Sequence, residues 1–353
     1  MPVPAELPTL LSRALIAFTI EFDNEFEHRM PHRTSLSRAA GTPMRGPWLV
    51  SLAMWANFLR FVDAGGVTLT EVDDLARLVN LGGLQRWGYV TVDDGMVRLT
   101  RAGQGARRVW APLGAQIESR WADRFGADLV TGLNDALTEV AERLDPLLPW
   151  YLPVASVYRV EPADQLLARP RPEIAPDLPA LLARVLLAFA HDFEEQSRLS
   201  LALGANVLRV LSPDGVPQRD LPALTGVSRE AVNVSAGFLE RRELAIVEPD
   251  PAAGRGKQIR LTDKGESAQD SYRRRLAETD GAWSGPAHDA VRAHLVELLG
   301  DGDRLAEGLR PYPDGWRANA PYAAATKALL RDPVGALPHY PMVSHRGGYP
   351  DGS

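Results

Sequence analysis

Residues 7–23 read LPTLLSRALIAFTIEFD, and residues 178–194 read LPALLARVLLAFAHDFE. Aligned without a gap, the two stretches share the pattern L-P-x-L-L-x-R-x-L-x-A-F-x-x-x-F. Apolar side chains recur at every fourth position of the first stretch, at Leu10, Ala14, Phe18 and Phe22. This spacing lies close to the period of an α-helix, so each stretch predicts an amphipathic helix that buries one face. The chain carries this helix twice.

Length and composition limit the classes of protein to which this chain can belong. With 353 residues, 45% of them hydrophobic, it has room for about two domains of ordinary size. It has no cysteine, which excludes disulfides, thiol catalysis and cysteine-ligated zinc. A net charge of -6 gives no overall attraction for polyanions, so nucleic-acid binding requires local basic patches. Residues 1–11, MPVPAELPTLL, have no basic segment before the apolar run, so we expect a cytoplasmic protein without signal peptide or membrane span.

The correspondence extends well beyond the first helix. Residues 56–62 align with 205–211, Gly66-Val67 with Gly215-Val216, 97–103 with 259–265, and Trp121 with Trp283. Each half therefore predicts two helices, two short helices, a strand, a turn, a second strand and long closing helices. That order is typical of a winged helix-turn-helix with additional helices before and after it.

The second half resembles the MarR (multiple antibiotic resistance) family of bacterial regulators. The resemblance rests on LPALTGVSREAV at 221–232, LERREL at 239–244 and IRLTDKG at 259–265, and it extends more weakly to the first half. These motifs are moderately specific, because similar ones occur in many winged-helix proteins. The resemblance implies that the first motif begins the recognition helix, the second ends it, and the third follows the wing.

The expected recognition helix of the second half carries residue types that suit DNA. Ser228 is a good N-cap, because its hydroxyl can accept a hydrogen bond from the first turn. Arg229 and Asn233 are of the types that pair with guanine and adenine edges. The family usually has polar residues where this chain has Val234 and Phe238. Because the helix is apolar nearly all round, an exposed apolar face that packs against protein or ligand is the alternative.

The expected wing of the second half is basic. Residues 248–258, EPDPAAGRGKQ, form a loop rich in proline and glycine that carries Arg255 and Lys257. Two cations on a loop of little bulk suit a phosphate backbone or a minor groove. The alternative is an ordinary solvated loop.

The first half departs further from the pattern. Residues 76–83 separate Leu75 from Leu84, whereas 225–238 separate the aligned Leu224 from Leu239, which predicts a shorter recognition helix. Its turn carries Asp93 and Asp94, which would repel phosphate. Arg86 is one of several arginines that make this half locally basic, and we keep it as a candidate DNA contact. A solvated helix face is the other interpretation of these arginines.

A small-molecule site is the second functional expectation. Residues 47–61, PWLVSLAMWANFLRF, gather Trp48, Trp55 and Phe58 in a stretch with almost no charge, and His191 lies where the first copy has Ile20. We predict that these four residues line a ligand pocket, since such pockets are apolar with few polar groups. The alternative is that they belong to the core. In the resembling family, phenolic and other aromatic compounds bind between the dimer helices and the winged domain.

Signatures of catalysis and of metal binding are weak. The chain has no P-loop, no glycine-rich dinucleotide fingerprint and no nucleophile elbow. His28 and His32 are four residues apart, but Pro31 breaks the helix that would align them. We therefore expect no enzyme activity, no cofactor and no metal site.

These patterns predict a mainly α protein with two tandem winged-helix repeats. We expect a first repeat at 1–158, a linker at 159–176, a second repeat at 177–312, and an extension rich in proline and glycine at 313–353. Proteins of the MarR family act as symmetric dimers, so the resemblance implies that two copies in one chain form a monomeric pseudo-dimer. Two independent domains on a linker are the alternative. The expected function is transcriptional regulation through double-stranded DNA, tuned by a small molecule. A ligand-binding or sequestering protein with decayed DNA-binding elements is the alternative, and an enzyme on this scaffold comes third.

Overall fold

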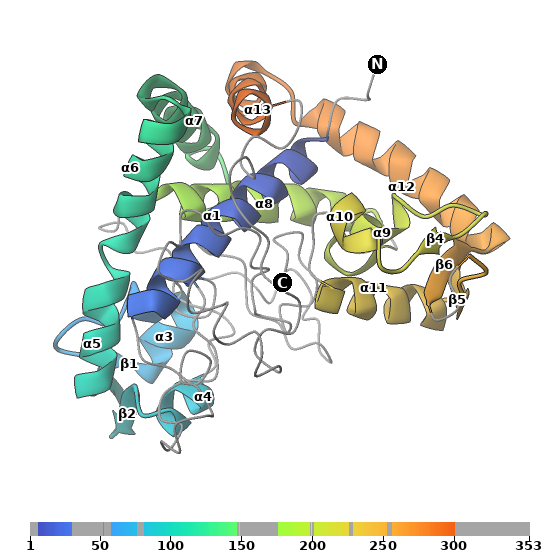
Figure 1. Ribbon diagram of the computed structural model, residues 1–353. Helices are drawn as coiled ribbons and strands as arrows, with labels where there is room; N and C mark the ends of the chain where they lie inside the picture. Colours follow the sequence, from blue (N-terminus) through green and yellow to red (C-terminus); the bar gives the residue numbers. More distant parts are fainter. Residues whose placement is uncertain are drawn as a thin grey trace.

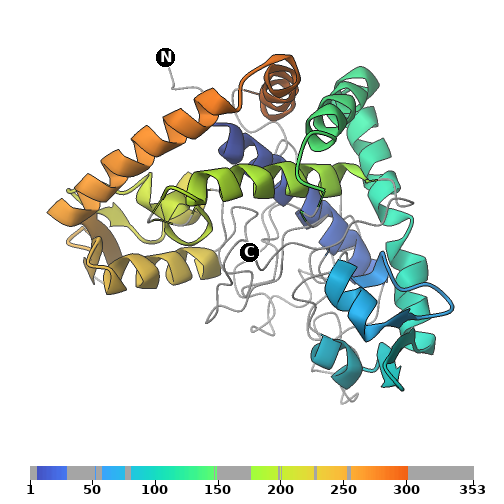
Figure 2. The same ribbon diagram turned by 180° about the vertical axis from the view of Figure 1, so that it is seen from behind.

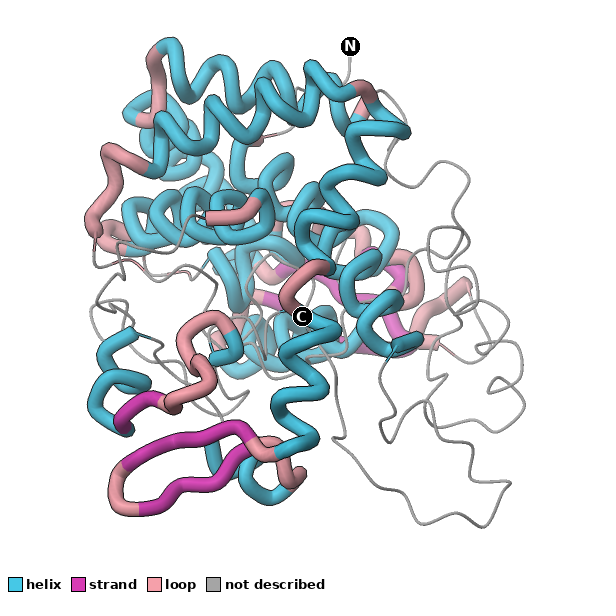
Figure 3. The backbone as a smooth tube through the Cα atoms, turned by 90° about the vertical axis from the view of Figure 1, so that its left-hand side faces the viewer, coloured by secondary structure: helices cyan, strands magenta, loops and turns pink. Residues whose placement is uncertain are grey.

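The computed structural model describes residues 6–29, 52, 58–75, 81–146, 148, 176–197, 199, 201–225, 229–252 and 256–300. Helices dominate these residues and the strands form two small antiparallel sheets, magenta in Figure 3, so the predicted mainly α class is confirmed. Within these ranges, no helix is long and apolar enough to cross a membrane.

From the first strand of each half to the second helix of its sheet unit and the two strands after it, the described elements follow the same order. The first comprises α1 (Leu7–Arg29), β1 (Val67–Thr68), α3 (Leu69–Leu75), α4 (Leu81–Arg86), β2 (Val90–Asp93), β3 (Met96–Leu99), α5 (Arg101–Trp110), α6 (Leu113–Phe125) and α7 (Ala127–Ala141). The second comprises α8 (Leu178–Glu194), a π-helical turn (Leu201–Ala205), α9 (Asn206–Leu208), β4 (Val216–Pro217), α10 (Leu221–Thr225), α11 (Arg229–Arg241), β5 (Ala245–Pro249), β6 (Lys257–Leu261), α12 (Asp263–Ala282) and α13 (Pro286–Leu299). A single helix, α12, takes the place of α5 and α6, which are separated at Pro112.

The two sheets have the same topology and the same register. Their strand orders are β1-β3-β2 and β4-β6-β5. Val97 lies between Val67 and Val92 in the first sheet, as Ile259 lies between Val216 and Val247 in the second.

The shared L-T-x-x-G motif joins the last strand of each sheet to the following helix. Thr100 and Thr262 accept hydrogen bonds from the backbone N–H groups of Gly103 and Gly265, and so cap α5 and α12. A Cβ at Gly103 would lie 2.1 Å from the Tyr89 carbonyl oxygen, and one at Gly265 would lie 1.9 Å from that of Leu244. Glycine is required there because the helix begins directly against the strand backbone.

The two halves pack against each other through their first and last helices. α1 packs against α8, and α7 packs against α13, while α1 also touches α13 and α8 also touches α7. α8 runs across α1 in the view from behind (Figure 2), and the two sheet units lie at opposite ends of this helical centre (Figure 1). Buried residues of both halves belong to one continuous hydrophobic cluster. The packing therefore differs from that of two independent domains on a linker.

Equivalent tryptophans fix the long helices to the first helix of each half. Trp121 contacts Phe18 edge-on at 5.3 Å, and its indole N–H donates to Glu21 Oε1 at 3.1 Å. Trp283 contacts Phe189 at 5.3 Å, and its indole N–H donates to Asp192 Oδ2 at 2.7 Å. Sequence alignment of the halves places these partners at matching positions, so the same anchor occurs twice.

An arginine of each half faces the beginning of the other half's first helix. Arg60 binds Asp177 Oδ1 at 2.8 Å, and Asp177 is the N-cap of α8. The aligned Arg209 is mostly buried, which lowers its pKa, while the charges of Tyr272 and of Glu6, just before α1, act in the opposite direction. Each of the two aligned arginines is thus influenced by an acidic residue just before the first helix of the other half.

Candidate nucleic-acid interface and ligand cavity

Helix α11 is amphipathic in the structure. Its apolar side points into the core, where Val232, Ala236 and Leu239 are at most 4% exposed. Phe238 is half-buried, and the Arg242 guanidinium lies over its ring at 4.5 Å from the centroid. The expected apolar outer face is therefore largely a core face, although the side chain of Val234 is outside the described residues. The opposite side of α11 exposes Asn233.

Two of the predicted DNA contacts meet at Gln218, just after β4. Its side-chain amide donates to Asn233 Oδ1 at 2.6 Å, and its backbone N–H donates to the carbonyl oxygen of Lys257 at 2.8 Å. Gln218 thereby joins the exposed side of α11 to the β5–β6 hairpin, on which Lys257 is exposed. The sequence had not singled out Gln218, because its role depends on segments that only the fold brings together.

The side chains of the remaining predicted DNA contacts in the second half lie outside the described residues. Arg229 begins α11, but its side chain lies outside the described residues, as do Ser228 and Arg255. The hairpin that would carry Arg255 is closed by a hydrogen bond from Asp250 N to Gly256 O at 3.0 Å. These three residues stay predictions.

The first half offers a smaller and more acidic surface. Its α4 has 6 residues, Leu81–Arg86, whereas α11 has 13, and residues 76–80, just before α4, lie outside the described residues. Arg86 and Gln85 are exposed at the end of α4. The β2–β3 turn exposes Asp93 and Asp94 and is tight, with a φ of 50° at Asp94 and of 74° at Gly95.

The part of the chain that the structure describes does not place the four predicted ligand residues in one pocket. Trp48 and Trp55 lie outside them. Phe58 is 1% exposed within the core, and it lines neither of the two cavities described below. His191 is half-buried on α8, with Nδ1 3.8 Å from Asp192 Oδ1 and 3.7 Å from Glu195 Oε1. A pocket at these residues stays a prediction.

A cavity of about 600 Å³ lies in the second half, between the end of α8, the start of β5 and one side of α12. Its apolar lining is Leu199, Leu244 and Ala268, its neutral polar lining is Gln196, Ser197, Ser267, Ser271 and Tyr272, and its cations are Arg242, Lys264 and Arg275. This volume is within the usual range for small-molecule sites. The sequence did not predict it, because each of these arginines resembles an ordinary solvated residue.

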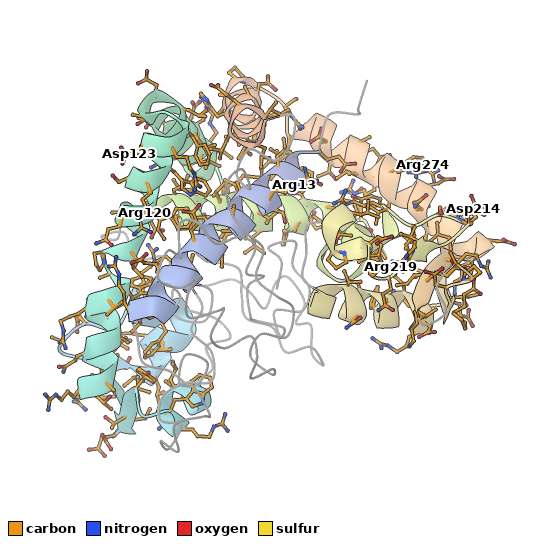
Figure 4. All side chains as sticks on the ribbon, viewed as in Figure 1. Arg13, Arg120, Asp123, Asp214, Arg219 and Arg274 are labelled. Carbon is orange, nitrogen blue, oxygen red and sulfur yellow. The ribbon has the colours of Figure 1, made fainter. Side chains whose placement is uncertain are left out.

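A second cavity, of about 20 Å³, lies where α1 meets the second half. Its lining includes Arg13, labelled on α1 in Figure 4, together with Arg209 and Tyr272. It has room for about one water molecule, so it is not a site for an organic ligand. Among the described residues, no group of three or more His, Asp or Glu side chains could hold a metal ion.

No protein-family model matches the chain, and no curated protein matches it. One similar solved structure is that of BpsR from Bordetella bronchiseptica, a protein whose DNA binding is regulated by 6-hydroxynicotinic acid. It shares 20% identity and covers 38% of this chain and 100% of that chain, with a TM-score of 0.31.

Proposed function

We propose that the chain is a ligand-responsive, DNA-binding transcriptional regulator of MarR-like type. In it, two winged helix-turn-helix repeats form a pseudo-dimer within one polypeptide. One observation carries the DNA-binding assignment: Gln218 joins exposed Asn233 on α11 to the hairpin that presents Lys257. A helix that reads base edges beside a hairpin that contacts phosphate is the usual arrangement of a winged helix on DNA. The repeated Trp121 and Trp283 anchors and the shared core support the pseudo-dimer.

The proposed regulator is asymmetric. The second half has the longer helix and the hairpin that exposes Lys257, so it makes most of the contacts with DNA. The first half has a helix of 6 residues and an acidic turn, so it contributes mainly by holding the second half in place. A fused chain permits this divergence, because no symmetry forces both halves to keep the same surface.

We expect the Lys257→Ala variant to bind DNA more weakly at all sequences. Loss of one phosphate contact should reduce the slope of log K against log salt by about one unit. The measurement is a fluorescence anisotropy titration with the DNA upstream of its own gene, at several salt concentrations. Arg274→Ala is the matched control, because Arg274 is exposed on the outer side of α12 (Figure 4). Equal slopes for wild type and Lys257→Ala would remove the hairpin from the interface.

The cavity of about 600 Å³ favours a second candidate function, a small-molecule binding or sequestering protein whose DNA-binding elements have decayed. The same titration separates the two candidates. Binding of DNA with a steep salt dependence supports the regulator. Absence of binding even at low salt, together with binding of a small molecule, supports the sequestering protein.

A further inference from the structure

We propose that Gly132 of α7 and His294 of α13 are equivalent residues that meet on the pseudo-twofold axis between the halves. Their difference in size lets each half fit the other half but not a copy of itself. This inference rests on the pseudo-dimer part of the proposed function and adds the residues that select the pairing. The partners that the pair excludes are the like halves of a second chain.

Gly132 and His294 touch where the two halves pack together. α7 and α13 contact each other and lie side by side in both views (Figures 1 and 2). A Cβ added at Gly132 would lie 2.8 Å from Cε1 and 2.9 Å from Nε2 of His294. The imidazole therefore lies directly against the backbone of α7, which leaves no room for a methyl group while the ring is in place. Glycine is unfavourable in a helix interior, and this close approach is a reason for it in α7.

The two residues occupy the same position in their halves. Gly132 follows the anchor Trp121 at the same spacing at which His294 follows the aligned anchor Trp283. In this register the buried residues of α7 and α13 coincide: Leu129 with Val291, Leu133 with Leu295, Ala136 with Leu298, and Leu137 with Leu299. A residue that contacts its own equivalent must lie close to the twofold axis that relates the two copies. The contact between Gly132 and His294 therefore marks this axis.

Pairing of like halves would bring identical residues together at the axis. Two first halves would place glycine against glycine and leave a void where the imidazole of His294 now lies. Two second halves would place one imidazole against another in a space that now holds a single ring, which is overpacking. Only the unlike pair fills this space once, so the contact favours a first half packed against a second half.

Neighbouring buried positions of the same two helices do not discriminate in this way. Leu133 and Leu295 are the same residue type at equivalent positions, as are Leu137 and Leu299. They present the same side chain to a like and to an unlike partner. A chain with two similar halves is able to join a second chain through either half, which leads to larger assemblies. The pair of Gly132 and His294 opposes that outcome.

Single substitutions in the full chain reproduce the like contacts. Gly132→His creates the histidine–histidine contact of two second halves, and His294→Gly creates the glycine–glycine contact of two first halves. Each should lower the thermal unfolding midpoint, measured by circular dichroism, by about 5 °C. The double variant Gly132→His/His294→Gly restores an unlike pair with the positions exchanged. Its midpoint should return to within about 2 °C of the wild type, because the two changes compensate each other.

Exposed neighbours on the same helices supply the matched controls. Thr131→His adds an imidazole to the outer side of α7 and should change the midpoint by about 1 °C or less. Ala293→Gly, at an exposed position of α13, measures the cost of glycine in that helix, and His294→Gly should lose more. The double variant Thr131→His/His294→Gly should show no rescue, because its new imidazole lies away from the axis.

Additive losses in the double variant Gly132→His/His294→Gly would overturn the proposal, as would single losses no larger than those of the controls. If Gly132→His does not fold, the added His294→Gly change should recover a folded chain, and failure to recover it would equally overturn the proposal. DNA binding is measured separately on the wild type. Loss of the rescue would therefore leave a DNA-binding function standing, and absence of DNA binding would leave the pairing standing.

Discussion

We expect Trp121→Ala to lower the free energy of unfolding by about 3–5 kcal/mol. Trp121 is fully buried, and its removal deletes the edge-on contact with Phe18 and leaves Glu21 without the indole N–H. The same change deletes an anchor between α6 and α1, which also packs on α8 of the other half. The loss should therefore affect the whole molecule and not only the first half. Urea unfolding followed by far-ultraviolet circular dichroism measures it.

Two further tryptophan variants test the reason for this effect. Trp283→Ala should destabilise the chain to a similar extent, because Trp283 makes the equivalent contacts with Phe189 and Asp192. Trp87→Ala should cost about 1 kcal/mol, since Trp87 is only half-buried at the edge of the core. A cost for Trp121→Ala no larger than that for Trp87→Ala would show that the proposed anchor does not fix α6 to α1.

We expect the second large effect from Gly265→Ala. A Cβ there would lie 1.9 Å from the Leu244 carbonyl oxygen, so α12 and β5 would have to move apart. Overpacking of this kind costs about 3 kcal/mol. Thr262 would also lose its alignment with the backbone N–H that it caps. The thermal unfolding midpoint should fall clearly, and DNA affinity should fall with it, because Leu244 connects α11 to the hairpin.

The same helix supplies the control for this substitution. Gly281 also lies in α12, but a Cβ added there would meet no atom of another segment within 4 Å. Gly281→Ala should stabilise the chain by about 0.5–1 kcal/mol, since alanine restricts the unfolded chain and favours the helix. If Gly265→Ala and Gly281→Ala have the same effect, the close approach at Gly265 does not explain its place in the motif.

Local patterns predicted the helices and the strand–helix junctions, and tertiary contacts decided the rest. The repeated helix at 7–23 and 178–194 could be recognised because the spacing of its apolar residues is a local property. The L-T-x-x-G motif likewise placed the strand and the capped helix correctly. The apolar side of α11 was misjudged because sequence does not distinguish a side that faces the protein's own core from one that faces a partner.

Part of the candidate site was not accessible to sequence reasoning at all. Gln218 joins two segments that are distant along the chain, and no spacing rule identifies such a residue. One cation of the cavity, Arg242, directly follows α11, and the others lie on one side of α12, so they form a cluster only after folding. The aromatic stretch at 47–61 indicated a ligand pocket from composition alone, and a core accommodates the same composition equally well.

A comparison of Asn233→Ala with Gln85→Ala tests the central claim, that the second half reads DNA while the first half supports it. Both residues are exposed on the helix that precedes the hairpin of their half. Fluorescence anisotropy with the DNA upstream of the gene should show a loss of about 1–3 kcal/mol in binding free energy for Asn233→Ala. Gln85→Ala should bind within about twofold of the wild type, as expected for a residue without a base contact. Equal losses in the two variants, or no loss for Asn233→Ala, would contradict this division of roles.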